Sequence, residues 1–145
     1  MTGLINMTAA GIAIDLNLLA GEITARFPGI YGAYLFGSAA SGQMRPESDL
    51  DIAILRPSPL SPDEVLGFKS FLSQKLRRDS DILDLYRTDS VTAAQVVTTG
   101  IEILSLNPLK MAEFETMALS RYALLNEERS EILKEIESTG TIYGR

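Results

Sequence analysis

The sequence contains neither cysteine nor histidine. Without cysteine there can be no disulfide, no thiolate nucleophile and no zinc site built on thiolate ligands. Without histidine there can be no Ser-His-Asp triad, no imidazole base and no metal site of two histidines and one carboxylate. Any chemistry must therefore come from carboxylates, hydroxyls, lysines, arginines and backbone groups.

Positive charge is also scarce, with 13 Lys and Arg residues against 19 Asp and Glu residues and a net charge of -6. This balance disfavours stable nucleic-acid binding and favours a basic protein partner. The first twenty residues contain no Lys or Arg and include Asp15, so they fit neither a signal peptide nor a membrane span. We therefore expect no membrane association and a cytoplasmic location.

The length and composition predict one domain over residues 1–145, because 145 residues with 46% hydrophobic content build one core of ordinary size. Residues 1–10 carry no clear pattern and are expected to be disordered. Helical and strand-like stretches alternate, which predicts an α/β (α+β) fold with a small mixed sheet flanked by helices. The expected helices are 15–27, 61–78, 91–99 and 107–137, and the expected strands are 31–36, 49–55, 81–86 and 101–106.

The last predicted helix, over residues 107–137, is unusually long for so small a domain. A run of about 30 helical residues measures about 45 Å, roughly twice what is needed to cover the sheet. Its distal half is therefore expected to protrude. The apolar stripe from about Tyr122 onward then predicts a binding surface, followed by a tail over residues 138–145.

Two short motifs carry the chemistry of the chain. Gly37 and Ser38 close the first strand of the predicted sheet, and Asp49 and Asp51 follow ten residues later. Two carboxylates at positions i and i+2 of a strand share one face, which suits them to bridging two hard cations. A glycine and a serine at a strand end can admit and hold the outer phosphates of a nucleotide. Each motif alone is usually structural, as a turn or a solvated strand edge, but their joint spacing favours a nucleotide site.

The pattern Gly37-Ser38-x10-Asp49-x-Asp51 resembles the signature of the nucleotidyltransferases related to polymerase beta. More narrowly, the chain resembles the minimal nucleotidyltransferase (MNT) group, and residues 121–145 resemble its MntA-type antitoxins, which are encoded beside HEPN-domain toxins called HepT. The resemblance implies a polymerase-beta-like fold, two Mg²⁺ ions and ATP as the substrate.

The resemblance also implies a third carboxylate on a later strand, which completes the metal site and takes the proton from the attacking hydroxyl. Asp81 and Asp84 compete for this role, and Asp81 fits the family's strand better, with Asp84 on the opposite face. Asp49, Asp51 and Asp81 are therefore the expected catalytic and metal-binding residues. Gly37, Ser38, Ser48 and Arg45 are the expected nucleotide-binding residues, although Ser48 also suits a role in orienting the strand. Three further cations are candidates for binding the triphosphate or neutralising the leaving pyrophosphate: Lys75, Arg77 and Arg78. Each of them, like Arg45, is more readily explained as an ordinary surface charge.

The resemblance finally implies a function, namely a protein adenylyltransferase antitoxin that transfers AMP to a tyrosine of a HepT-like ribonuclease in a hetero-oligomeric complex. Two alternatives stay open. One is an antibiotic-type nucleotidyltransferase, for whose usual drug-binding domain 145 residues leave little room. The other is an antitoxin that masks its toxin without catalysis, against which the intact Asp49 and Asp51 pair argues.

Overall fold

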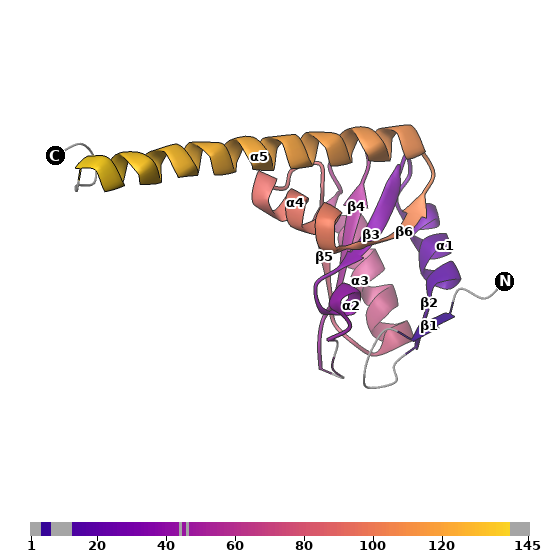
Figure 1. Ribbon diagram of the computed structural model, residues 1–145. Helices are drawn as coiled ribbons and strands as arrows, with labels where there is room; N and C mark the ends of the chain where they lie inside the picture. Colours follow the sequence, from indigo (N-terminus) through magenta and orange to yellow (C-terminus); the bar gives the residue numbers. More distant parts are fainter. Residues whose placement is uncertain (1–3, 7–12, 44, 46, 140–145) are drawn as a thin grey trace.

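The computed structural model describes residues 4–6, 13–43, 45 and 47–139 (Figure 1). A short hairpin is followed by alternating strands and helices, as the α/β prediction requires. In chain order the elements are β1 (Leu4–Asn6), β2 (Ala13–Asp15), α1 (Leu16–Arg26), β3 (Gly32–Phe36), α2 (Ser38–Ser41), β4 (Leu50–Leu55), α3 (Pro62–Leu76), β5 (Ser80–Asp84), α4 (Ser90–Thr99), β6 (Ile101–Ser105) and α5 (Pro108–Thr139).

The central sheet has four strands in the order β5-β4-β3-β6. Strand β3 runs antiparallel to both of its neighbours, whereas β4 and β5 are parallel and are connected through α3. This mixed arrangement places Asp51 of β4 opposite Phe36 on one side and Asp81 on the other. The sheet register thus brings together Asp51 and Asp81, which are thirty residues apart in the sequence.

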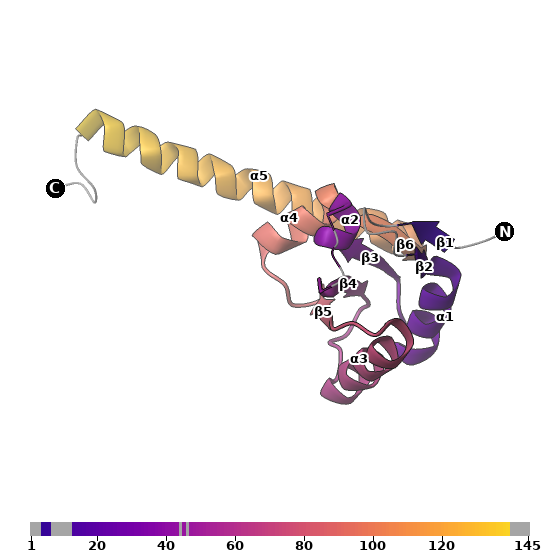
Figure 2. The same ribbon diagram turned by 90° about the horizontal axis from the view of Figure 1, so that it is seen from below.

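Helices cover both faces of the sheet, which gives two hydrophobic cores (Figures 1 and 2). On one face α1 and α3 pack on the inward side chains of β3 and β4, such as Leu35 and Ile52. On the other face α4 and α5 pack on Tyr34, Ala53 and Leu55. Because side chains alternate along a strand, β4 contributes to both cores.

Capping side chains that the sequence analysis predicted fix the starts of the helices. Asp15 accepts a hydrogen bond from the Leu18 amide at 3.1 Å and so caps α1. Ser61 and Glu64 form a reciprocal capping box at the start of α3, with Pro62 in the first helical position. These local signals explain why the predicted helices begin where they do.

The structure differs from the sequence prediction at three places. Residues 38–41, expected in a loop, form the single turn α2 between two glycines of positive φ, Gly37 and Gly42. Leu4–Asn6, expected to be disordered, pair with Ala13–Asp15. Strand β4 begins at Leu50, so Asp49 lies one residue before it. Residues 1–3 and 7–10 and the tail beyond Thr139 lie outside the described residues.

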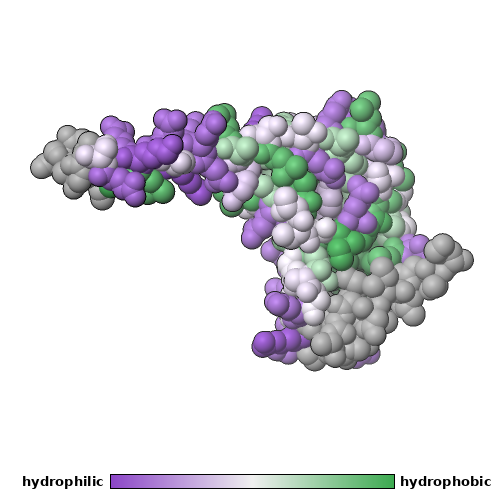
Figure 3. Space-filling view, viewed as in Figure 1, coloured by the Kyte–Doolittle hydropathy of each residue, from purple (hydrophilic) through white to green (hydrophobic). Residues whose placement is uncertain are grey.

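Helix α5 belongs to the core only near its beginning. Met111, Phe114 and Ala118 are buried, and the hydroxyl of buried Tyr34 donates to Glu115 at 2.7 Å. Beyond them the helix projects from the domain, as its length predicted (Figures 1 and 2). The projecting part is mostly hydrophilic in Figure 3, yet it exposes the hydrophobic residues Leu124, Ile132 and Leu133. No helix among the described residues is both long and apolar enough to cross a membrane.

One ion pair joins the end of β4 to the start of α3. The guanidinium of Arg56, only 7% exposed, contacts Glu64 at 2.6 and 2.9 Å and also donates to the carbonyls of Pro28, Ser58 and Pro59. The hydrogen bonds from Arg56 and from the Ser61 amide lower the pKa of Glu64 from 4.5 to about 2. Since the folded pKa is depressed, this stabilisation is complete above pH 4.5 and is lost as the pH falls through 2.

We expect Glu64→Gln to lower the free energy of unfolding by about 3 kcal/mol at neutral pH, because one pKa unit corresponds to about 1.4 kcal/mol. Urea unfolding at a series of pH values measures this, and the difference from wild type should shrink between pH 4.5 and 2. The control is Glu22→Gln, which removes the half-exposed pair with Arg26 and should cost less than about 1 kcal/mol. Equal losses in both variants would contradict the prediction.

Candidate functional site: three aspartates at one end of the sheet

Three aspartates meet where β4 and β5 begin. Asp51 lies on β4 and is half-buried, Asp81 is its direct partner on the parallel strand β5, and Asp49 stands one residue before β4. Burial is the largest cause that raises the pKa of Asp51, and the charges of Asp81 and Asp49 raise it further. The negative charges of Asp49 and Asp81 thus both act on the carboxylate of Asp51.

Gly37 closes the site from the side of β3. Its φ of +68° and ψ of -143° form a conformation that is essentially restricted to glycine. A β-carbon added at this position would also collide with the Oδ2 atom of Asp51. Both the backbone conformation and the space beside Asp51 therefore require glycine here. The adjacent Ser38 begins α2, and its hydroxyl makes no hydrogen bond to the part of the chain that the structure describes.

A divalent cation such as Mg²⁺ is the ligand class that this cluster fits. Carboxylate oxygens are hard donors of the kind that Mg²⁺ prefers, and a cation would relieve the repulsion that raises the pKa of Asp51. As the side chains stand, the described residues include no group of three acidic side chains already gathered as a ligand set. The fit therefore rests on the chemistry of the donors and on their mutual repulsion.

Asp84, the competitor for the third position, is used elsewhere. Its Oδ2 atom accepts the Leu60 amide at 3.0 Å, and its Oδ1 atom accepts the Tyr86 amide at 3.0 Å. Arg87 adds an ion pair at 3.4 Å. These contacts order the loop before α3 and the loop after β5. The geometry favours Asp81 for the third position, because Asp81 lies opposite Asp51 in the sheet.

The two remaining predicted nucleotide-binding residues, Ser48 and Arg45, form a closed turn before Asp49. The Ser48 hydroxyl accepts the Arg45 amide at 2.9 Å, and the Ser48 amide donates to the Arg45 carbonyl at 3.0 Å. Ser48 thus orders the loop that leads to Asp49, and its nucleotide-binding role stays a prediction. The Arg45 side chain is exposed, and its nucleotide-binding role stays a prediction.

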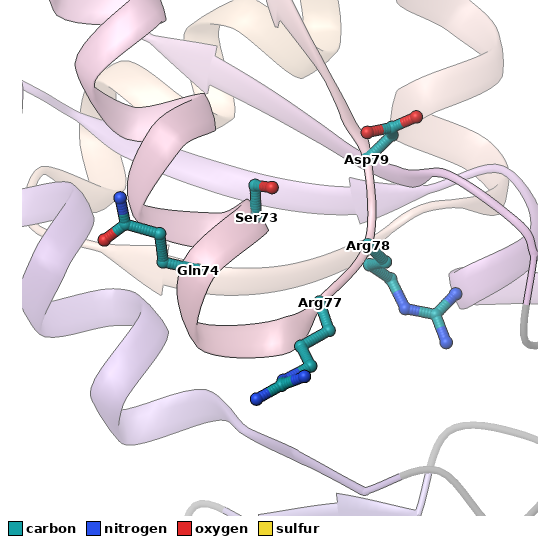
Figure 4. Close-up of a pocket in the computed structure, with 5 residues that line it drawn as sticks. All are labelled: Ser73, Gln74, Arg77, Arg78 and Asp79. Atoms are coloured by element: carbon teal, nitrogen blue, oxygen red, sulfur yellow. The ribbon is translucent and has the colours of Figure 1, made fainter.

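Two hollows lie along the end of α3, and the first of them reaches Asp49. One, of about 360 Å³, is lined by Asp49, Lys69, Ser70, Ser73, Asp79 and Ser80. The other, of about 400 Å³, is lined by Ser73, Gln74, Arg77, Arg78 and Asp79 (Figure 4). Figure 4 shows the side chains of Arg77 and Arg78 extending in different directions after the helix ends. The buried hydroxyl of Ser80 lacks a partner among the described residues. Lys75 lies instead by a small cleft between α1 and α3.

Sequence reasoning missed the residues that hold the loop before Asp49. The Arg78 guanidinium donates to the carbonyls of Ser48 and Arg45, although it had been read as a surface charge. The Asp79 carbonyl accepts the Leu50 amide. No local pattern signals these contacts, since they join positions about thirty residues apart.

The Gly37-Ser38 turn at the end of β3, Asp49 and Asp51 at the start of β4 and Asp81 on the parallel strand β5 are arranged as the sequence analysis expected for a nucleotidyltransferase. Residues 21–109 match the family described as polymerase beta nucleotidyltransferase. This chain therefore belongs to the polymerase beta nucleotidyltransferase family, as its motif predicted. The protein adenylyltransferase MntA of Shewanella oneidensis is 31% identical over 103 residues, which cover 71% of this chain and 73% of that protein.

Solved structures agree with this assignment. A chain of a toxin-antitoxin crystal structure with AMP-PNP superposes with a TM-score of 0.74 and 27% identity, covering 86% of this chain and 99% of that one. A chain of a structure of tri-AMPylated Shewanella oneidensis HEPN toxin in complex with MNT antitoxin gives a TM-score of 0.67 and 26% identity, covering 84% and 95%. The predicted fold and the resemblance to minimal nucleotidyltransferases are confirmed.

Proposed function

We propose that this chain is a Mg²⁺-dependent protein adenylyltransferase that transfers AMP from ATP to a tyrosine of a HEPN-domain ribonuclease toxin in the cytoplasm. The observation that carries the proposal is the proximity of Asp49 and Asp81 to Asp51, beside the glycine-restricted backbone of Gly37. The acceptor is inferred from the relatives, in which an adenylyltransferase and complexes of toxin with antitoxin recur.

The transfer step makes one bond and breaks one. The acceptor hydroxyl oxygen attacks the α-phosphorus of ATP, the bond from that phosphorus to the bridging oxygen breaks, and pyrophosphate leaves. Asp81, exposed at the start of β5, accepts the proton of the attacking hydroxyl. Gly37 lets the triphosphate approach the backbone, and the Ser38 hydroxyl donates to an outer phosphate oxygen.

The carboxylates of Asp49, Asp51 and Asp81 would hold Mg²⁺. When bound, the metal supplies neutralising charge for the α-phosphate and the leaving pyrophosphate. The protein's own contribution is mainly position, since the sheet register fixes Asp51 against Asp81 before any ligand arrives.

Adding AMP to a ribonuclease has a direct physical consequence. The attached nucleotide brings bulk and negative charge, which repels an RNA backbone and competes for basic groups that would bind it. Because one enzyme molecule modifies many partners, neutralisation needs less than one equivalent of this chain. A masking antitoxin needs a full equivalent.

The deciding experiment incubates a limiting amount of wild-type protein, or of its Asp49→Asn variant, with ATP, Mg²⁺ and excess cognate HEPN-domain partner. Intact mass and RNA cleavage are then measured. A gain of whole AMP units with loss of cleavage, seen with wild type only, supports the proposal. Inhibition by both proteins at one-to-one ratio without a mass change would establish masking instead.

The projecting part of α5 is the surface that we assign to the partner. Its residues 123–139 include five glutamates against Arg129 and Lys134, and they expose the apolar side chains of Leu124, Ile132 and Leu133. Exposed apolar side chains among an excess of acidic ones suit a partner of basic character. This acidic excess also disfavours pairing with a second copy of the same helix.

We expect truncation after Glu128 to weaken binding of the HEPN-domain partner by roughly 10-fold or more, since each large apolar anchor of an interface carries at least about 1–2 kcal/mol. Titration calorimetry with the partner and with an ATP analogue measures both affinities, and nucleotide affinity should be unchanged. Ile132→Ser should weaken the complex, whereas Lys134→Ser should not. Unchanged partner affinity after truncation would place the interface elsewhere.

A further inference from the structure

The two peptide groups that flank Asp49 are both held by the segment before β5. The Ser48 carbonyl accepts a hydrogen bond from Nη1 of Arg78 at 2.6 Å. The Leu50 amide donates to the Asp79 carbonyl at 2.9 Å. Two consecutive residues, Arg78 and Asp79, therefore fix the backbone immediately before and immediately after this aspartate.

The same guanidinium also restrains the loop that leads to Asp49. Nη1 of Arg78 donates to the Arg45 carbonyl at 3.1 Å as well, and Arg45 and Ser48 already close a turn on each other. Arg78 therefore donates hydrogen bonds to two carbonyls of a turn that Arg45 and Ser48 already close. Hydrogen bonds from a charged donor are about twice as strong as neutral ones, so this contact is the main restraint on that turn.

The end of α3 directs Arg78 toward this turn. Arg77 adopts the left-handed conformation, with a φ of 56°, and its amide closes the helix on the Ser73 carbonyl. Its side chain is exposed and makes no hydrogen bond to any residue within the described ranges. Of these two adjacent arginines of equal charge, Arg78 alone donates side-chain hydrogen bonds to the loop before Asp49 among the described residues.

Beyond Asp79 the chain enters β5, where Asp81 lies opposite Asp51. One short segment, residues 78–81, thus sets the position of Asp49 through hydrogen bonds and that of Asp81 through strand register. A displacement of about 1 Å at a catalytic centre costs on the order of 100-fold in rate. The carboxylates therefore need this segment to be rigid in order to keep their positions.

We propose that Arg78 is a positioning residue that aligns Asp49 with Asp51 and Asp81 by clamping the Ser48 and Arg45 carbonyls. This inference rests on the proposed nucleotidyl transfer at these aspartates. It assigns Arg78 a role different from binding the triphosphate, because the Nη1 group is already committed to two backbone carbonyls. The two roles make opposite kinetic predictions.

The test compares Arg78→Ala and Arg78→Lys with the matched control Arg77→Ala. Hydrogen exchange over residues 45–50 reports the clamp without any catalysis, and Arg78→Ala should speed exchange there about 10-fold. In transfer assays its kcat should fall roughly 10–100-fold and the Mg²⁺ concentration for half-maximal rate should rise, with KM for ATP nearly unchanged. Arg78→Lys should recover part of kcat, because one ammonium can still donate to the Ser48 carbonyl.

Other outcomes overturn the inference. A raised KM for ATP with unchanged kcat would make Arg78 a phosphate ligand, and equal losses in Arg77→Ala would trace the effect to lost charge. Unchanged hydrogen exchange in Arg78→Ala would show that the clamp does not order the loop. Should Arg78→Ala fail to fold, Arg78→Lys with wild-type exchange and kinetics would also reject the inference. A wild-type protein without transfer activity would reject the proposed function, whereas the exchange experiment tests the clamp independently.

Discussion

Replacing Asp51 with asparagine is expected to abolish AMP transfer while leaving the fold intact. The carboxylate is half-buried between Asp81 and Gly37, and burial first, then the negative charges of Asp81 and Asp49, raise its pKa. Asparagine keeps the shape and removes the charge that would hold a cation, so we expect a loss of roughly 10³-fold or more. Transfer of labelled AMP to the partner measures this loss.

The stability of the same variant provides the control, because removing the Asp51 charge reduces the electrostatic repulsion between the aspartates in the folded protein. Without metal, the thermal midpoint of Asp51→Asn should equal or exceed that of wild type, which shows that the lost activity is not lost folding. Asp81→Asn should be equally inactive. Asp84→Asn should retain most activity, since Asp84 binds the Leu60 and Tyr86 amides instead. Full activity of a folded Asp51→Asn protein would refute the assigned mechanism.

Gly37→Ala should produce the second large effect. The new methyl group would meet the carboxylate of Asp51, and the backbone conformation at this position excludes side chains. We expect about 1–3 kcal/mol of lost stability from the backbone and, from the displaced carboxylate, on the order of 100-fold loss in kcat. Denaturant unfolding and the transfer assay measure the two effects separately.

Gly29→Ala is the matched control for that substitution. Gly29 also has a positive φ, of +80°, but a β-carbon there would meet nothing within 4 Å. Its substitution should cost stability through the backbone alone and leave kcat unchanged. A similar loss of kcat in both variants would mean that general destabilisation, and not contact with Asp51, explains the effect at Gly37.

The parts of this fold that the sequence predicts are those determined locally. Asp15 and Ser61 mark helix starts because a capping side chain acts within three residues of its own position. The Gly37-Ser38 and Asp49-x-Asp51 motifs predicted the family, which the match over residues 21–109 confirms, because residue type and spacing are local features of the sequence. The preference for Asp81 over Asp84 came from the family resemblance and stays a prediction, although Asp84 makes other hydrogen bonds, to the Leu60 and Tyr86 amides.

The parts that escaped prediction depend on distant contacts or on very short elements. Helix α2 is one turn of small residues, whose composition is equally typical of a loop. The pairing of β1 with β2 involves three residues on each strand, too few to show an alternating pattern. Arg78 contacts Ser48 and Arg45 only because α3 returns the chain to the start of the sheet, so nothing in its sequence neighbourhood distinguishes it from Arg77.

Helix α5 is anchored at one end by Met111, Phe114 and Ala118 and extends from there as a continuous rod to Thr139. At about 1.5 Å per residue, its 32 residues measure on the order of 48 Å. A partner bound at the far end of α5 would therefore lie at a fixed distance from the aspartates. If the proposed partner binds there, we expect only an acceptor side chain at the matching distance from the bound surface to reach the three aspartates.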